Sequence, residues 1–82
     1  MKLPVIRHLQ RNNDSEKLQH TIDVLESFTE HRSVSEEEMD VIGELITNLC
    51  GAVEVHKMIE DGASEMDAAN NFAKKVIGSI DR

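Results

Sequence analysis

Apolar residues recur at helical spacing along almost the whole chain, and nothing in it resembles a strand, a repeat or a low-complexity tract. Leu18, Ile22 and Leu25 follow one another at intervals of four and three residues. That spacing puts side chains on one face of an α-helix. The longest run of this kind lies between residues 36 and 61. The pattern therefore predicts an all-α protein.

Residues that favour helix starts divide this pattern into segments. Pro4 suits a first turn, where its missing N–H costs nothing, and Asn13 or Asp14 can cap the next segment. The third start is the clearest, because Ser35 and Glu38 stand three residues apart as a capping box requires. We therefore expect three helix starts between residues 3 and 36.

Residues that favour helix ends complete the division. His31 and Arg32 suit a last turn, and Gly62 is the residue type best able to adopt the left-handed conformation after a helix. Ser64 can then cap a final segment that exits at Gly78. We expect a small bundle of three main helices and a short N-terminal one, at about 3–11, 15–32, 36–61 and 65–77.

The third segment carries an apolar arc of about 220°, which needs cover on more than one side. A helix of this length is about 39 Å long, whereas a compact domain of this size is about 30 Å across. Three shorter helices are therefore not expected to cover it fully. The arc is formed by Met39, Val41, Ile42, Leu45, Ile46, Leu49, Ala52, Val53, Val55, His56 and Ile59.

Part of this arc has the 3–4 spacing of a coiled-coil seam, although it lasts for under three heptads. Beside it, Gly43, Thr47 and Cys50 form a lane of small residues that another helix can approach closely. A helix break near Gly51 and room for a ligand remain as alternatives. We predict a homodimer through the third helix. Its packing residues are expected to be Ile42, Gly43, Ile46, Thr47, Leu49, Cys50 and Val53.

Length and charge narrow the class of protein. The chain has 82 residues and a net charge of −7, so we expect one helical domain over 1–82. Residues 1–13 carry three bases and no acid, whereas residues 14–62 carry thirteen acids and three bases. Excess acid disfavours nucleic acid as a partner. No window is apolar enough to cross a membrane, and we expect a cytoplasmic protein.

The candidate chemistry is sparse. Cys50, the only cysteine, lies mid-helix, away from any helix N-terminus that would lower its pKa. His56 lies six residues on, about 120° around and 9 Å along the helix, so the two side chains cannot pair within it. We expect an inert thiol and a packed histidine. No motif for a metal, a cofactor or catalysis appears, which favours a non-enzymatic role.

Four stretches of the sequence are distinctive: "MKLPVI" at the start, "DVIGEL" and "EVHKM" in the centre, and "GSID" near the end. Together they resemble a family of small uncharacterised all-helical proteins from Bacteroidetes. The resemblance spans nearly the full length. It implies a bacterial, cytoplasmic setting and supplies no functional residue.

Two functions from different classes fit these observations. The favoured one is a protein-interaction or regulatory module that presents helical surface to a partner protein and acts as a homodimer. The alternative is a small-molecule or metal-binding protein, conceivably redox-linked, with Cys50, His56 and Asn48 around a site at the subunit interface.

Overall fold

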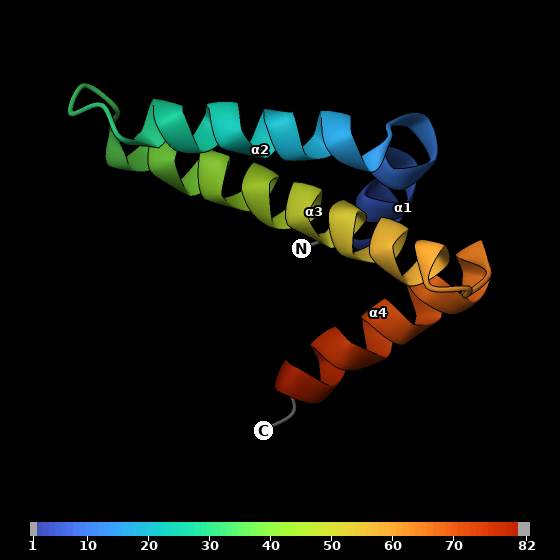
Figure 1. Ribbon diagram of the computed structural model, residues 1–82. Coiled ribbons are helices and arrows are strands. Elements are labelled where there is room, and N and C mark those ends of the chain that lie inside the picture. The colour runs from blue at the N-terminus through green and yellow to red at the C-terminus, as the bar shows by residue number, and fades with distance from the viewer. Residues whose placement is uncertain (1, 81–82) are drawn as a thin grey trace.

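The computed structural model describes residues 2–80 of the chain, and the side chains of residues 2–75. The described chain forms four helices and no strand, which confirms the predicted all-α class. Figure 1 shows their order and arrangement. The helices are α1 (Leu3–Asn12), α2 (Ser15–Thr29), α3 (Glu36–Glu60) and α4 (Glu65–Ile80).

The predicted starts of α2, α3 and α4 are confirmed by side-chain caps, whereas α1 has no such cap and begins with Pro4 in its first turn, as predicted. The Ser35 hydroxyl accepts a hydrogen bond from the Glu38 N–H, and the Glu38 carboxylate accepts one from the Ser35 N–H, which completes the capping box. Of the two candidates before α2, Asp14 is the cap and accepts from the Lys17 N–H at 2.7 Å. Ser64 caps α4 by accepting from the Asp67 N–H at 3.1 Å.

Helix α3 ends as the sequence predicts, at a glycine with positive φ. Gly62 has φ 111°, and its N–H bonds to the Ile59 carbonyl. The next N–H, of Ala63, bonds back to the Met58 carbonyl at 3.1 Å. These two bonds form a Schellman motif, which satisfies carbonyls that the helix end would otherwise leave without partners.

Two helix ends differ from the prediction. Helix α2 ends at Thr29 rather than near residue 32, because the N–H groups of Glu30 and His31 bond to carbonyls three residues back instead of four. His31 then accepts from the Ser33 N–H in the connecting turn. Helix α4 continues to Ile80, beyond the expected end at 77, and Gly78 lies within it rather than at its exit.

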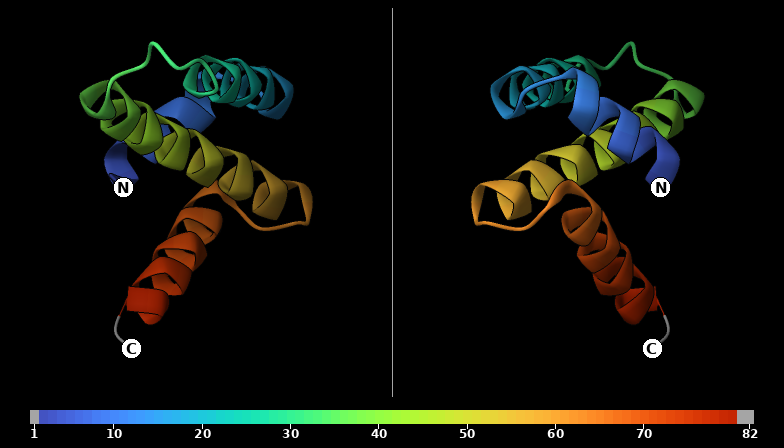
Figure 2. Two further views of the ribbon diagram at one scale, coloured as in Figure 1. Left: turned by 90° about the vertical axis from the view of Figure 1, so that its left-hand side faces the viewer. Right: turned by 90° about the vertical axis from the view of Figure 1, so that its right-hand side faces the viewer.

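Helices α2 and α3 form an antiparallel hairpin, and the other two helices pack near one end of it. Figures 1 and 2 show α1 lying across the second half of α3, while α4 turns away from the end of α3. The core lies where these helices meet, and the largest fully buried side chains there are Ile6 and Val55. The rest of the core consists of Leu18, Ile22, Leu49, Ala52, Ala68 and Phe72.

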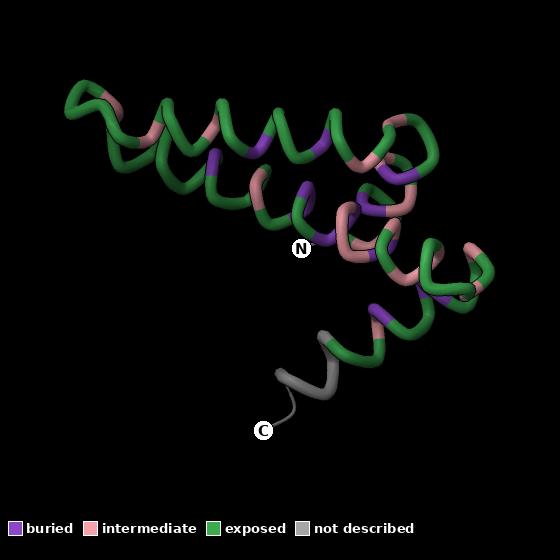
Figure 3. Tube along the Cα trace, viewed as in Figure 1, coloured by how far each residue is buried: buried purple, intermediate pink, exposed green. Residues whose placement is uncertain are grey.

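This arrangement is open. The radius of gyration is 13.7 Å, against about 12 Å for a compact chain of this length, and the extents are 42 × 32 × 17 Å. Figure 3 shows exposed residues predominating at the loop end of the hairpin and buried residues gathering where α1 and α4 meet α3. Within the described residues, no helix is long and apolar enough to cross a membrane.

Candidate functional site

Two of the three predicted ligand-binding residues hold α1 against α3. The Asn48 side chain is buried, and its Oδ1 accepts from the Lys2 N–H at 2.9 Å, at the start of α1. At the other end of α1, His56 Nε2 lies 2.7 Å from the Asn13 carbonyl oxygen. Because a carbonyl only accepts, Nε2 donates in this bond. Asn48 and His56 therefore fix the two ends of α1.

The third predicted residue, Cys50, is exposed on α3. Partial burial of the thiol raises its pKa, and the negative charge of Glu26 on α2 raises it further. A raised pKa keeps the sulfur protonated at neutral pH, whereas reactive and metal-binding cysteines are thiolates. Cys50 and Asn48 are two residues apart and so point to different sides of the helix. The alternative of a shared ligand site therefore gains no support from the geometry.

Metal binding gains no support either. Among the described residues, no group of three or more His, Cys, Asp or Glu side chains is placed to hold an ion.

The predicted packing residues of α3 divide into two sets. Ile42 and Leu49 are buried within the chain itself, Leu49 in the core, and Ile46 and Val53 are half-buried against that core. The lane of small residues, in contrast, is not covered. Gly43, Thr47 and Cys50 are all exposed. A Cβ built on Gly43 would meet nothing within 4 Å, so no part of the described chain packs on the lane there.

Close helix approach occurs instead at Gly51, for which the sequence suggested a helix break. That alternative is wrong, because α3 continues unbroken to Glu60. A Cβ on Gly51 would lie 2.8 Å from Ile6 Cδ1 and 3.1 Å from Phe72 Cζ. Gly51 therefore gives α1 and α4 room to pack on α3. In the sequence, Gly51 lies next to the apolar arc of this helix, and that position could have indicated the close packing.

Sequence reasoning missed an apolar hollow at the loop end of the hairpin. We call it the tip hollow. It is open to solvent, has a volume of ≈ 350 Å³, and is lined by Phe28, Glu37, Glu38, Val41 and Ile42. Phe28 comes from α2 and is 50% exposed. Val24 and Leu45 lie one turn from Phe28 and Val41 and are also exposed, so they extend the apolar surface along both helices.

The surroundings of the tip hollow are strongly acidic. Residues 24–45 carry seven acids and one arginine, a net −6 out of the −7 of the whole chain. Hydrogen bonds from Ser35, first from its backbone N–H and then from its hydroxyl, hold the pKa of Glu38 below its usual value. That carboxylate at the edge of the hollow therefore stays ionised at neutral pH.

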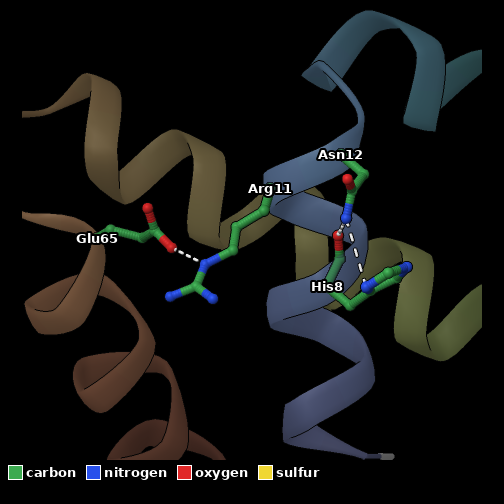
Figure 4. A network of polar contacts seen from close by, with 4 residues as sticks. All are labelled: His8, Arg11, Asn12 and Glu65. Carbon is green, nitrogen blue, oxygen red and sulfur yellow. Dashed lines mark hydrogen bonds and ion pairs between the residues drawn. The ribbon is translucent and has the colours of Figure 1, made fainter.

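A separate polar cluster joins α1 to α4 (Figure 4). Arg11 Nε donates to the Glu65 carboxylate in an ion pair between the two helices. The bond from Arg11, and then the charges of Arg11 and Arg7, hold the pKa of Glu65 below its usual value. On the far side of α1, Asn12 donates to the His8 carbonyl at 2.8 Å. The Arg11–Glu65 pair therefore positions α4 beside α1, whereas the Asn12 bond lies within α1.

Comparisons with known proteins give the family and nothing more. Neither the curated proteins nor the solved structures include a match to this sequence. A family model does match, over residues 1–81, and its description is a family of unknown function (DUF6952). It covers nearly the full length, as the resemblance in the sequence implied. The chain therefore belongs to this uncharacterised family, DUF6952.

Proposed function

We propose that this protein is a protein-interaction or regulatory module that presents the loop end of its α2–α3 hairpin to a partner protein and works as a homodimer. One observation carries the proposal. Of the seven large apolar side chains that are exposed in the described chain, five lie within residues 24–45. They are Val24, Phe28, Met39, Val41 and Leu45. Apolar side chains gathered in this way mark interaction surfaces more often than scattered ones do.

The amount of exposed surface supports association. The chain exposes 5860 Å², whereas a compact monomer of 9.2 kDa is expected to expose about 4,900 Å². The excess is comparable to the roughly 800 Å² that each partner buries in a standard protein–protein interface. Association with another protein chain would cover this excess of exposed surface.

The small lane of α3 suits the homodimer. Gly43, Thr47 and Cys50 are exposed, and the Thr47 hydroxyl already donates to the Gly43 carbonyl at 2.8 Å. A second α3 crossing antiparallel at Thr47 would therefore leave no hydroxyl without a partner. It would also place the acidic first half of each α3 beside the second half of the other, which keeps the two acidic ends apart. A bacterial, cytoplasmic and non-enzymatic role completes the proposal.

Native mass spectrometry of the untagged full chain tests the homodimer. We expect a dimer without added mass for the wild type and a monomer for Gly43→Leu, because the leucine side chain keeps the two α3 helices apart. Gly43→Ala is the matched control and should remain dimeric. Since a Cβ built on Gly43 would meet nothing within 4 Å among the described residues, both variants should fold normally.

Two results would count against the proposed function. A wild type that stays monomeric at tens of micromolar removes the homodimer. A metal or small molecule retained in the spectrum removes the preference for an interaction module, and then Cys50→Ser and His56→Ala are the first variants to compare.

A further inference from the structure

One stripe of α3 is covered along half of its length and open along the other half. Its residues are spaced by four and three positions and so lie on one side of the helix. They are Val41, Leu45, Asn48, Ala52 and Val55, which we call the α3 stripe. Ala52 and Val55 are fully buried, whereas Val41 is 59% exposed and Leu45 is 48% exposed. The stripe changes from exposed to buried at Asn48, whose side chain accepts a hydrogen bond from the Lys2 N–H at the beginning of α1.

The covering helix shows what kind of partner this surface accepts. Helix α1 buries Ile6 in the core and packs Leu3 and Leu9 against it. Residues 1–13 also carry three basic side chains and no acid. One of these, Lys2, lies with its Nζ 3.9 Å from the Glu44 carboxylate on α3. An amphipathic helix with basic flanks therefore already occupies the closed half of the α3 stripe.

The open half of the α3 stripe also combines apolar side chains with acidic residues, and both are more prominent there. Val41 and Phe28 line the tip hollow, and Leu45 and Val24 extend it along both helices. Glu37 and Glu38 also line the hollow, within a segment of net charge −6. An apolar groove between two helices is a surface into which an amphipathic helix docks. Its acidic surroundings favour a partner with lysine and arginine on its flanks and disfavour acidic ligands.

We propose that the tip hollow binds a helix of a partner protein, with its apolar face toward Phe28 and Val41 and with basic residues on both flanks. This proposal rests on the interaction role given above and names the chemistry of the partner. The bound helix would take the place that a longer α1 would occupy on α3. Two copies of this chain are disfavoured here, because the meeting of two hollows would bring two segments of charge −6 together.

Two synthetic peptides of about 18 residues, long enough to be partly helical, serve as probes. Both carry the same leucine and alanine face; one has lysine and arginine on its flanks and the other has glutamate. Fluorescence anisotropy with the full chain should show at least tenfold tighter binding of the basic peptide. The difference should shrink as the salt concentration rises, because exposed charges are screened.

Paired variants locate the binding site. Phe28→Ala should weaken binding of the basic peptide about tenfold, as truncation of a central aromatic anchor does. Met66→Ala, which shortens an exposed apolar side chain on α4, should leave it unchanged. Glu37→Lys should also weaken binding, whereas Glu60→Lys, at the exposed end of α3, should have little effect.

Three outcomes overturn the proposal. The first is equal binding of both peptides, and the second is equal loss on Phe28→Ala and Met66→Ala. The third is no binding of the basic peptide; if Phe28→Ala then converts a dimer to a monomer, a second copy occupies the hollow. The homodimer is tested separately at Gly43, which lies about 160° around α3 from Val41 and Leu45. The two proposals can therefore fail independently.

Discussion

The two halves of α3 differ in what covers them more than in what they are made of. Along the α3 stripe, both halves offer aliphatic side chains at the same spacing. Only the second half is buried, because α1 has 10 residues and α3 has 25. At 1.5 Å per residue, α1 spans about 15 Å of a helix that is about 38 Å long. Helix α1 is therefore too short to cover the first half of α3 as well as the second.

The charged residues near the two halves of α3 also differ. Near the closed half, acids lie beside bases: Glu54 on α3 is 3.2 Å from Lys75 on α4, and Glu65 pairs with Arg11. Such exposed ion pairs contribute little stability, but they select the partner and its orientation. The segment around the open half, residues 24–45 from α2 to α3, has seven acids and one arginine. A helix that completed the open half would have to supply the missing positive charge itself.

The largest expected effect comes from one substitution made in each half. Val55→Ala removes two methyl groups from a side chain with no exposed surface, and it should lower the free energy of unfolding by about 2 to 3 kcal/mol. Val41→Ala removes the same groups from a side chain that is 59% exposed, and the change should stay within about 0.5 kcal/mol. Urea denaturation followed by circular dichroism measures both. Similar losses at the two positions would show that the open half is covered in solution.

The two glycines of α3 also distinguish its open half from its closed half, with a smaller expected change in stability. Gly43→Ala should raise the free energy of unfolding of the protomer by up to about 1 kcal/mol, because alanine favours helix and no other part of the described chain lies within 4 Å of the new methyl group. Gly51→Ala gains the same propensity but places its methyl group 2.8 Å from Ile6 Cδ1. Overpacking of this kind costs about 1 to 3 kcal/mol, so the net change should be a loss.

Both glycine variants are compared by thermal denaturation at a concentration that keeps the chain monomeric. Opposite signs at the two positions are the expected result. Stabilisation by Gly51→Ala would mean that Ile6 and Phe72 move apart easily and that this junction is loosely packed.

The helix starts could be predicted from the sequence because each cap is decided within four residues. Ser35 and Glu38 satisfy each other's backbone N–H groups wherever the rest of the chain lies. The end of α2 was less predictable. His31 and Arg32 are compatible with a last turn, but neither they nor Ser33 offers an apolar side chain that would hold another turn against α3.

The tip hollow and the roles of Asn48 and His56 depend on contacts between distant parts of the chain. Asn48 meets a residue 46 positions away, and His56 meets one 43 positions away. Phe28 and Val41 approach each other only because the hairpin turns between them. The wide apolar arc of α3 did indicate that part of it would stay uncovered. Which part stays open follows from where α1 begins, and helical spacing alone does not contain that information.

The smallest expected effect concerns the ion pair that holds α1 beside α4 at the closed end. The folded pKa of Glu65 is lowered from 4.5, chiefly by the hydrogen bond from Arg11, so the contribution of this pair is fully present above pH 4.5 and is lost as pH falls through the folded pKa. In Arg11→Met, which keeps most of the apolar stem, the pKa of Glu65 should rise toward 4.5. A carboxyl-carbon NMR titration measures this shift, and Lys17→Met on α2 serves as the control. An unchanged pKa of Glu65 in Arg11→Met would mean that α1 and α4 are not joined through this pair, and the closed end would then depend on apolar packing and on the bonds from Asn48 and His56.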